Sequence, residues 1–496
     1  MKTYQEFKQV DYPEIGESVL KYWKENQIFE QSVTNRDGAE TFTFFEGPPS
    51  ANGTPGIHHV MARTLKDIFC RYKTLQGFQV KRKGGWDTHG LPVELQVEKE
   101  LGITKEDIGK KISVEEYNQK CRETVMRFKN EWDDLTEKIG YWVDLDDPYI
   151  TFEPNYIESV WSLLKKLYEK DLIYKGYTIQ PYSPAAGTGL SSHELNQPGT
   201  YKDVKDTSIT AQFKLKGEEN TYIIAWTTTP WTLPANSALA IGENLDYVKV
   251  KTFNPYTFDA CTVILAKARM NSYLNPKAAE LKLEDYKGGD KLIPFEVIEE
   301  FKGKDMLGWE YEQLFPIAGL ALAHPAFTVV SGDYVTTEDG TGIVHLAKAF
   351  GADDFRTLAQ NSVPGVFVKD EQGKDIPIVD KRGKFITMVG EYLVDKVAEH
   401  AITAHKEYGV DDFYVKNYTE DDESAADFKS TDVIISIILK NENKAFKVEK
   451  YEHSYPHCWR TDKPVLYYPM DSWFIKTTAY KDRLVELNKT TRSSSL

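Results

Sequence analysis

Cysteine is scarce in this sequence and is never arranged in closely spaced pairs. The four cysteines in 496 residues are Cys70, Cys121, Cys261 and Cys458, and none belongs to a Cys-x-x-Cys motif. This argues against a disulfide framework and a zinc cluster, and it favours a reducing, cytoplasmic location. Long apolar runs are absent as well. Because no stretch of about 18 uninterrupted apolar residues occurs, we expect no membrane-spanning helix.

Positive charge is in deficit. The chain has 61 Lys and Arg against 76 Asp and Glu, which gives a formal net charge of -15. An acidic chain of this kind is not a nonspecific coat for nucleic acid. The basic stretch Lys81-Arg82-Lys83 is still compatible with an RNA partner, so composition leaves that question open.

The first part of the chain predicts a strand, a loop, a helix and a second strand. Residues 41–45, Thr-Phe-Thr-Phe-Phe, are typical of a buried strand, and residues 78–80 begin another extended segment. Between them, one face of a helix is predicted by an apolar stripe, and Gly77 stands where a helix-ending glycine belongs. The stripe consists of Met61, Leu65, Ile68, Tyr72 and Leu75. Such a unit is the building block of a parallel nucleotide-binding sheet.

The rest of the chain changes character twice. Residues 104–142 and 153–172 are predicted to be mostly helical, whereas short β-rich runs separated by turns follow from about residue 180. These runs are 207–215, 221–229, 247–253, 261–266 and 326–335. After about residue 450 the pattern returns to strand and helix. We therefore predict an α/β fold in which a Rossmann-like parallel-sheet domain is interrupted by a large β-rich, barrel-like insertion.

The loop at residues 47–57 has the composition of a phosphate-binding loop. Prolines and glycines crowd ahead of the predicted helix, which lets a phosphate approach backbone amides and the positive helix end. Neither GxxxxGK[ST] nor GxGxxG is present. His58 and His59 follow, and imidazoles there can donate hydrogen bonds to phosphoryl oxygens as charge develops. For two adjacent histidines alone, a surface loop with solvated rings is the alternative.

This stretch resembles the first signature of the class I aminoacyl-tRNA synthetases, a Pro-Asn-Gly loop that ends in His-Ile-Gly-His. Here the four residues read Gly56-Ile57-His58-His59, which is similar to one subgroup of isoleucyl enzymes. The resemblance implies that His58 and His59 are catalytic and leaves open which of them contacts phosphate. It also implies loop contacts with ATP, from Gly47, Pro49, Asn52, Gly53 and Gly56.

Residues 84–94, Gly-Gly-Trp-Asp-Thr-His-Gly-Leu-Pro-Val-Glu, resemble a segment shared by the isoleucyl, valyl and leucyl enzymes. Its carboxylate, Asp87, is suited to hold the ammonium group of an amino acid. For an isolated Asp in a glycine-rich loop, turn chemistry is the alternative. The resemblance implies that Pro48 and Trp473 line the isoleucine side-chain pocket, whereas a core aromatic is the alternative for Trp473.

Two stretches of the β-rich part stand out, 225–241 and 340–355. Three consecutive threonines before Pro-Trp break strand alternation and offer hydroxyls to a small polar ligand. A lone histidine such as His345 is usually a satisfied core residue, and an acid pair such as Asp353-Asp354 is usually solvated or caps a helix.

Together these stretches resemble the editing domain of the same enzymes, in the isoleucyl form Thr-Thr-Thr-Pro-Trp-Thr-Leu-Pro-Ala-Asn. The resemblance implies that Thr227, Thr228 and Thr229 surround an ester and a water, beside His345. It implies that Asp354 holds the α-amino group of a wrongly attached amino acid. No metal is needed, because a positioned water attacks an activated ester. One departure is Lys348, where the family often has Pro.

The resemblance implies an isoleucyl-tRNA synthetase fragment with a HUP-type catalytic domain. Residues 1–180 are expected to form the first part of the catalytic domain and residues 181–450 an inserted editing (CP1) domain. In residues 451–496 the chain is expected to return to the catalytic domain. The expected activities are activation of isoleucine with ATP and Mg²⁺, transfer to tRNA(Ile), and hydrolysis of Val-tRNA(Ile). The expected protein is a cytoplasmic monomer without structural zinc. The second ATP signature, Lys-Met-Ser-Lys-Ser, is not found, so we expect an N-terminal portion without full aminoacylation activity.

Three alternatives remain at this stage. The first is a valyl- or leucyl-tRNA synthetase, and the second is a non-catalytic fragment that only binds tRNA. The third is a small nucleotidyltransferase with the same histidine-bearing loop. The β-rich insertion argues against the third, because such an enzyme needs no editing pocket.

Overall fold

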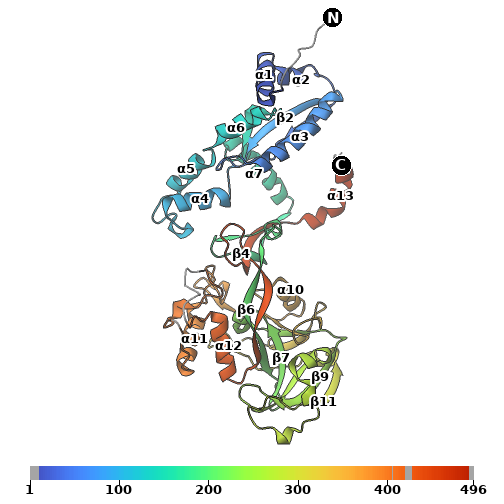
Figure 1. Ribbon diagram of the computed structural model, residues 1–496, viewed down its shortest axis with the longest axis vertical. Coiled ribbons are helices and arrows are strands. Elements are labelled where there is room, and N and C mark those ends of the chain that lie inside the picture. The colour runs from blue at the N-terminus through green and yellow to red at the C-terminus, as the bar shows by residue number, and fades with distance from the viewer. Residues whose placement is uncertain (1–9, 405, 419–426, 491–496) are drawn as a thin grey trace. The chain divides into compact units, whose positions relative to one another are not determined.

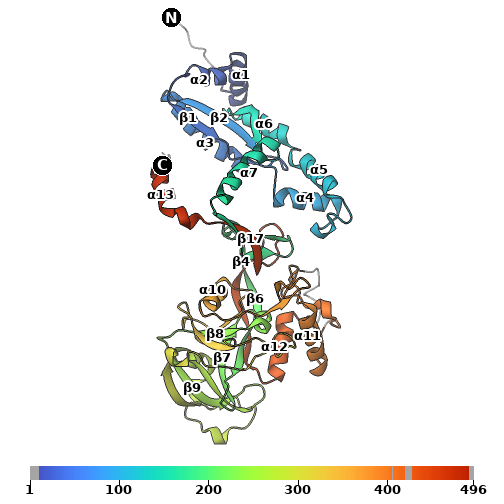
Figure 2. The same ribbon diagram turned by 180° about the vertical axis from the view of Figure 1, so that it is seen from behind.

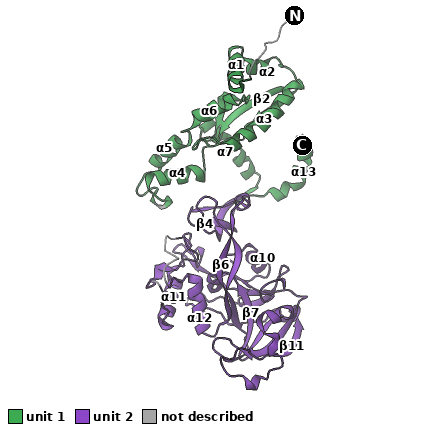
Figure 3. Cartoon of the chain, viewed as in Figure 1, with its two compact units in different colours: residues 1–174, 475–496 green, residues 175–474 purple. Residues whose placement is uncertain are grey.

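The computed structural model describes residues 10–404, 406–418 and 427–490 and divides into two compact units (Figures 1 and 3). Unit 1 contains Met1–Tyr174 and Ile475–Leu496, and unit 2 contains Lys175–Phe474. Among the described residues, no helix combines the length and the apolar character that crossing a bilayer requires.

Unit 1 is built around a three-stranded parallel sheet in the order β1-β2-β3. Strand β1 (Thr41–Phe45) is followed by the loop and by helix α3 (Ile57–Leu75), and the chain then forms β2 (Gln79–Trp86). Gly77 has φ +94°, the left-handed conformation expected where a helix ends. The predicted strand–loop–helix–strand unit is confirmed. Strand β3 (Asp144–Ile150) completes the sheet.

Seven further α-helices belong to the described residues of unit 1. They are α1 (Tyr12–Glu25), α2 (Ile28–Thr34), α4 (Leu91–Leu101), α5 (Val114–Val125), α6 (Lys129–Lys138), α7 (Pro154–Tyr168) and α13 (Lys481–Thr490). Of these, α5, α6 and α7 confirm the helical prediction for residues 104–142 and 153–172. A small core of Ala51, Trp86 and Trp132 lies beside the loop. This core fixes the loop against the carboxyl end of β2.

The prediction that residues 41–45 form a buried strand is wrong in part. In β1 the aromatic side chains of Phe42 and Phe44 are half-buried, whereas Phe45 is 62% exposed. The apolar stripe of α3 is also exposed, from Met61 to Leu75. The physical reason is that β1 is an edge strand and that the described residues of unit 1 do not cover this stripe.

Unit 2 contains a six-stranded sheet in the order β11-β9-β10-β7-β6-β16 and a three-stranded sheet in the order β12-β8-β13. Most neighbours are antiparallel, and β7–β10 and β8–β12 are parallel. The strands are β6 (Tyr201–Lys214), β7 (Thr221–Thr227), β8 (Ala238–Ile241), β9 (Asp246–Phe253), β10 (Ala260–Ala266), β11 (Glu296–Lys302), β12 (Thr328–Ser331), β13 (Ile343–Leu346) and β16 (Ala445–Pro456). They confirm the predicted β-rich runs.

In the described part of unit 2, two further sheets and five α-helices accompany these strands. Helix α12 packs against β6, β16 and α11 (Figure 2). The helices are α8 (Ser192–Leu195), α9 (Met270–Tyr273), α10 (Ala352–Gln360), α11 (Thr387–Glu399) and α12 (Thr431–Asn441). The additional strands are β4 (Ile173–Ser183), β5 (Thr188–Gly189), β14 (Phe367–Lys369), β15 (Asp375–Pro377) and β17 (Leu466–Ile475). The sequence-based limits at 180 and 450 both fall within continuous strands, β4 and β16.

The close approach of β2 to β3 makes a testable prediction. A Cβ at Gly84 would lie 2.7 Å from the carbonyl oxygen of Asp144 on β3. We expect Gly84→Ala to lower the free energy of unfolding by about 1–3 kcal/mol, because the strands must move apart. Gly16→Ala in α1 is the control, since its Cβ would meet nothing within 4 Å. The control should raise stability by up to about 1 kcal/mol. Equal effects in urea unfolding would contradict the described strand packing.

Candidate functional site

The loop between β1 and α3 lies at the carboxyl ends of two parallel strands. The N–H of Glu46 donates to the carbonyl of Lys83 at 2.8 Å, and the N–H of Asp87 donates to the carbonyl of Pro49 at 2.9 Å. The N–H of Phe128 donates to the carbonyl of Ala51 at 3.0 Å. Open parallel sheets bind ligands at this edge. The fold therefore brings the loop and the Asp87 segment together, as a shared site requires.

His59 lies in the first turn of α3, where its ring caps the helix. The N–H of Gly56 donates to Nδ1 of His59 at 2.8 Å, so the neutral ring carries its proton on Nε2. Burial, and then the charges of His58 and Arg63, lower the pKa of His59. The two imidazole rings are 3.8 Å apart, and His58 is exposed. His59 is thus a neutral Nε2–H donor at the helix mouth.

Sequence reasoning missed the residues that pack around His59 at the N-terminus of α3. The ring of Trp132 lies 4.6 Å from that of His59, and its Nε1–H donates to the carbonyl of Gly53 at 2.8 Å. Arg63 is buried and its guanidinium also lies over the Trp132 ring, 5.0 Å from the ring centre. Glu46, 3% exposed, accepts hydrogen bonds from Lys66 and Tyr141. The available signal was spacing, since Arg63 and Lys66 follow His59 by one and two helical turns.

The residues predicted to bind the amino acid lie in different places. Asp87 is exposed directly after β2, and Oδ1 accepts weakly from the N–H of His89 at 3.4 Å. Pro48 is half-buried in the loop, next to Pro49, which contacts Asp87 through the backbone. Trp473 belongs to unit 2, on β17, and is 66% exposed. The alternative of a core aromatic is therefore wrong for Trp473.

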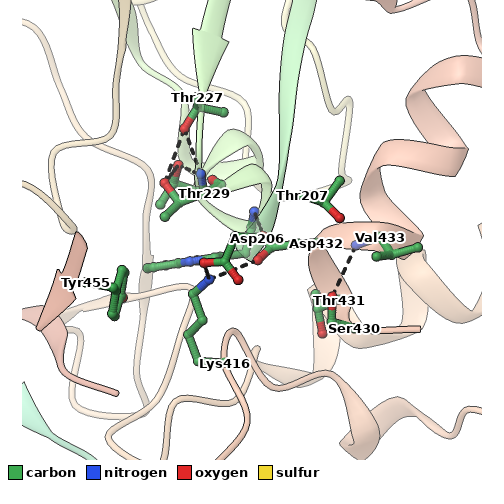
Figure 4. Close-up of polar contacts among 12 residues, drawn as sticks. Asp206, Thr207, Thr227, Thr229, Lys416, Ser430, Thr431, Asp432, Val433 and Tyr455 are labelled. Atoms are coloured by element: carbon green, nitrogen blue, oxygen red, sulfur yellow. Dashed lines mark hydrogen bonds and ion pairs between the residues drawn. The ribbon is translucent and has the colours of Figure 1, made fainter. Parts of the chain in front are cut away.

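The three threonines lie where β7 ends and a short 3₁₀ helix, η2 (Pro230–Ala235), begins. The N–H of Thr229 donates to the hydroxyl oxygen of Thr227 at 3.1 Å, and the two hydroxyl oxygens are 3.2 Å apart (Figure 4). Thr227 and Thr228 line a cavity of about 380 Å³. Its opposite wall is the loop containing Gly340 and Gly342, which both have positive φ. The hydroxyls are therefore gathered beside a cavity large enough for a small polar ligand.

His345, on β13, is buried behind the threonines and fixes their turn. The side-chain oxygen of Asn236 accepts from the hydroxyl of Tyr311 at 2.7 Å. The side-chain nitrogen of Asn236 therefore faces His345 and donates to its Nδ1 at 3.2 Å. The proton of His345 is then on Nε2, which donates to the Thr232 hydroxyl at 2.8 Å. That hydroxyl donates in turn to the carbonyl of Thr229 at 2.8 Å. Burial lowers the pKa of His345 to about 4, so the ring is neutral.

The two acids of the pair have different environments. Asp353 is exposed and pairs with Arg356 at 3.1 Å. Asp354, in the first turn of α10, is half-buried and accepts from the N–H of Ala347 at 2.8 Å. Burial, together with the charge of Asp353, raises the pKa of Asp354 to about 6. Burial and then the charge of Asp354 raise the pKa of Tyr334, which lines the cavity, to about 12.

The Lys348 side chain is held by a backbone carbonyl outside the threonine turn. The Nζ of Lys348, which stands where a Pro is frequent, donates to the carbonyl of Val363 at 2.9 Å, away from the threonine turn's hydrogen bonds. Among the described residues, no group of three or more His, Cys, Asp or Glu is arranged to hold a metal ion.

Residues 18–495 match the family described as tRNA synthetases class I (I, L, M and V). The chain belongs to this family. It is 64% identical to the isoleucine–tRNA ligase of Cytophaga hutchinsonii over 97% of this chain and 43% of that protein. It is 59% identical to the isoleucine–tRNA ligase of Bacteroides fragilis over 99% of this chain and 43% of that protein. The chain therefore spans less than half of the length of these curated relatives.

The predicted class I synthetase family is confirmed, and with it a mixed α/β fold that has a parallel sheet and a β-rich insertion. Among solved structures, the chain is similar to a ternary complex of Agrobacterium radiobacter K84 agnB2 LeuRS, tRNA and LeuAMS. The TM-score is 0.31 at 15% identity, over 79% of this chain and 47% of that one.

The buried carboxyl of Asp354 makes a prediction about stability. Its pKa is about 6, against an ordinary value of 3.8. A raised folded-state pKa stabilises the fold below the unfolded pKa, and this contribution is lost as pH rises through the folded pKa. We therefore expect Asp354→Asn to gain about 3 kcal/mol over the original chain between about pH 4 and pH 7.

Urea unfolding of both chains across this pH range tests the prediction. His345, whose pKa is lowered to about 4, has the opposite pH dependence. It is present in both chains, so its contribution cancels in the difference. A difference in stability that does not change with pH would contradict the described burial of Asp354.

Proposed function

We propose that this chain contains the amino-acid activation and editing regions of an isoleucyl-tRNA synthetase. Its identity of 64% and 59% to isoleucine–tRNA ligases supports this substrate. The observation that carries the proposal is the threonine turn beside a cavity, whose wall includes Tyr334, the tyrosine whose pKa is raised by burial and by the charge of Asp354. We assign activation to unit 1 and editing to unit 2. A valyl or leucyl specificity is the second candidate, and the isoleucyl form of residues 227–236 speaks against it.

Activation joins isoleucine to ATP. The amino-acid carboxylate attacks the α-phosphorus, and pyrophosphate leaves. The Nε2–H of His59 donates to phosphoryl oxygens as negative charge grows, with His58 beside it. Asp87 pairs with the substrate ammonium, and Pro48 contacts the substrate side chain. The ATP contacts come from the loop residues Gly47, Pro49, Asn52, Gly53 and Gly56. Mg²⁺ accompanies the ATP phosphates and neutralises their charge.

Editing removes valine from tRNA(Ile) by hydrolysis. A second pocket is needed because valine is smaller than isoleucine by one methylene and enters any pocket that isoleucine fits. In unit 2, the hydroxyls and backbone groups of Thr227, Thr228 and Thr229 hold the ester and a water, while His345 acts on their turn through Thr232. Asp354 holds the α-amino group. Positioning of the water supplies the catalysis, since the ester is already activated.

Several features of the whole protein are part of this proposal. The sheet of unit 1 is taken as half of a Rossmann-like, HUP-type domain, and the sheets of unit 2 as parts of a barrel. The partner is tRNA(Ile), whose acceptor end reaches both units. The protein acts as a cytoplasmic monomer.

The acid pair gives a matched test of the editing assignment. The chain should hydrolyse Val-tRNA(Ile) faster than buffer, and Asp354→Ala should lower this rate by about 100-fold, because the substrate loses its orientation. Asp353→Ala is the control, because Asp353 is exposed and pairs with Arg356 instead. Equal rates for the two variants would rule out the role of Asp354.

The amino-acid site is tested by calorimetry with a non-hydrolysable isoleucyl-adenylate analogue. Asp87→Asn should weaken binding by about tenfold or more, because the ammonium loses a charge-assisted partner. Asp146→Asn, at an exposed position of β3, should bind like the original chain. No heat of binding from the folded original chain would favour a fragment that only binds tRNA. Stronger binding of the valyl or leucyl analogue would favour the second candidate.

A further inference from the structure

Three charged residues from distant parts of unit 2 meet beside the threonine turn, and we name them the Asp206–Lys416–Asp432 triad. Nζ of Lys416 donates to Asp206 at 2.7 Å and to Asp432 at 3.2 Å (Figure 4). Asp206 is on β6, Asp432 is in the first turn of α12, and Lys416 lies in the segment between η7 (Val410–Asp412) and α12. The side chains of Lys416 and Asp432 are 9% and 5% exposed. Lys416 and Asp432 are therefore almost completely removed from solvent, whereas the side chain of Asp206 is 26% exposed.

Further contacts hold the triad in one arrangement. Nζ of Lys416 lies 5.1 Å from the centre of the Tyr455 ring, and His453 contacts Asp206 at 3.1 Å between Nε2 and Oδ2. Both residues are on β16. Buried ion pairs of this kind add little stability compared with well-packed apolar residues. A role in fixing the geometry of a neighbouring segment therefore explains the triad better than a role in stability.

The triad reaches the threonine turn through one backbone hydrogen bond. The N–H of Trp231 donates to Oδ1 of Asp432 at 2.9 Å, so the carboxylate binds Trp231 with one oxygen and Lys416 with the other. The next residue, Thr232, is bound from the other side by His345. Adjacent residues of η2 are thus anchored by two separate elements, α12 and β13.

These two anchors determine where the hydroxyls of the turn lie. Both the N–H and the hydroxyl of Thr232 donate to the carbonyl of Thr229, at 3.0 and 2.8 Å. A rotation of the turn at Trp231 would therefore move Thr229 relative to Thr227. Without Asp432, the buried N–H of Trp231 would lose its partner, and the turn would lose one of its two anchors.

We infer that Asp432, held by Lys416 and Asp206, is a positioning residue of the editing site, which fixes the turn that carries Thr227 and Thr229. The inference rests on the editing function proposed above. Asp432 does not contact the substrate in this scheme. It acts on the reaction through the backbone of Trp231, so its loss affects the orientation of the reacting groups more than the binding of tRNA.

The first test separates kcat from KM in the hydrolysis of Val-tRNA(Ile). Asp432→Ala should lower kcat by at least about tenfold while KM changes by less than about twofold, because misorientation slows the chemical step. Asp432→Asn should recover part of the loss, since its amide oxygen still accepts from Trp231 although it no longer pairs with Lys416. A change in KM alone would overturn the inference.

The matched control is Ser430→Ala. Ser430 caps the same helix, accepting from the N–H of Val433 at 3.4 Å, but does not contact the turn (Figure 4). This variant weakens the start of α12 and should leave kcat unchanged at a temperature where all variants are folded. Equal losses of kcat in Ser430→Ala and Asp432→Ala would show that α12 stability, rather than the Trp231 contact, controls the rate.

Amide hydrogen exchange tests the positioning without any activity. The amides of Trp231 and Thr232 should exchange about tenfold faster or more in Asp432→Ala than in the original chain, and not in Ser430→Ala. Unchanged exchange would overturn the inference. If the original chain fails to hydrolyse Val-tRNA(Ile), the proposed function fails, and the exchange experiment still decides whether Asp432 fixes the turn.

Discussion

The hydrogen bond between the Thr232 hydroxyl and the buried ring of His345 determines how the threonine turn of unit 2 is built. Each neighbour in the chain of contacts allows one direction of donation, from Tyr311 through Asn236 to His345, Thr232 and Thr229. A buried polar group that loses its partner costs about 1–3 kcal/mol, so each member keeps the next in place. The series ends at the backbone carbonyl of Thr229, in the turn that lies beside the cavity.

The loop of unit 1 uses a histidine in the same way. His59 accepts a backbone N–H on Nδ1, which leaves Nε2–H as the donor, and burial contributes to keeping the ring neutral. In both units, therefore, a hydrogen bond accepted by Nδ1 places the proton of the neutral ring on Nε2. The two histidines differ in exposure, because His59 lies at the N-terminus of α3 and His345 is buried on β13, beneath the threonine turn. The first is suited to contact a ligand and the second to hold the residues that do.

Local features of this structure could be predicted from the sequence. The β1–α3–β2 unit, the conformation of Gly77 and the strands around the threonines depend on residues close together in the chain. What covers a surface could not be predicted in this way, since the apolar stripe of α3 shows only that the helix is amphipathic. The Asp206–Lys416–Asp432 triad was also beyond sequence reasoning. Lys416 lies 210 residues from Asp206, and a single charged residue in a polar segment has no local pattern.

The pairing of β6 with β16 has a consequence for how unit 2 folds. Asp206 and His453 contact each other across these strands although 247 residues separate them. During synthesis β6 is complete long before β16 leaves the ribosome, whereas β7 follows it directly. One edge of β6 is therefore open for most of that time, and its unpaired amides and carbonyls are available to other strands. Closing this pair carries the entropy cost of a long loop, so this edge of β6 gains its partner only after β16 has been made.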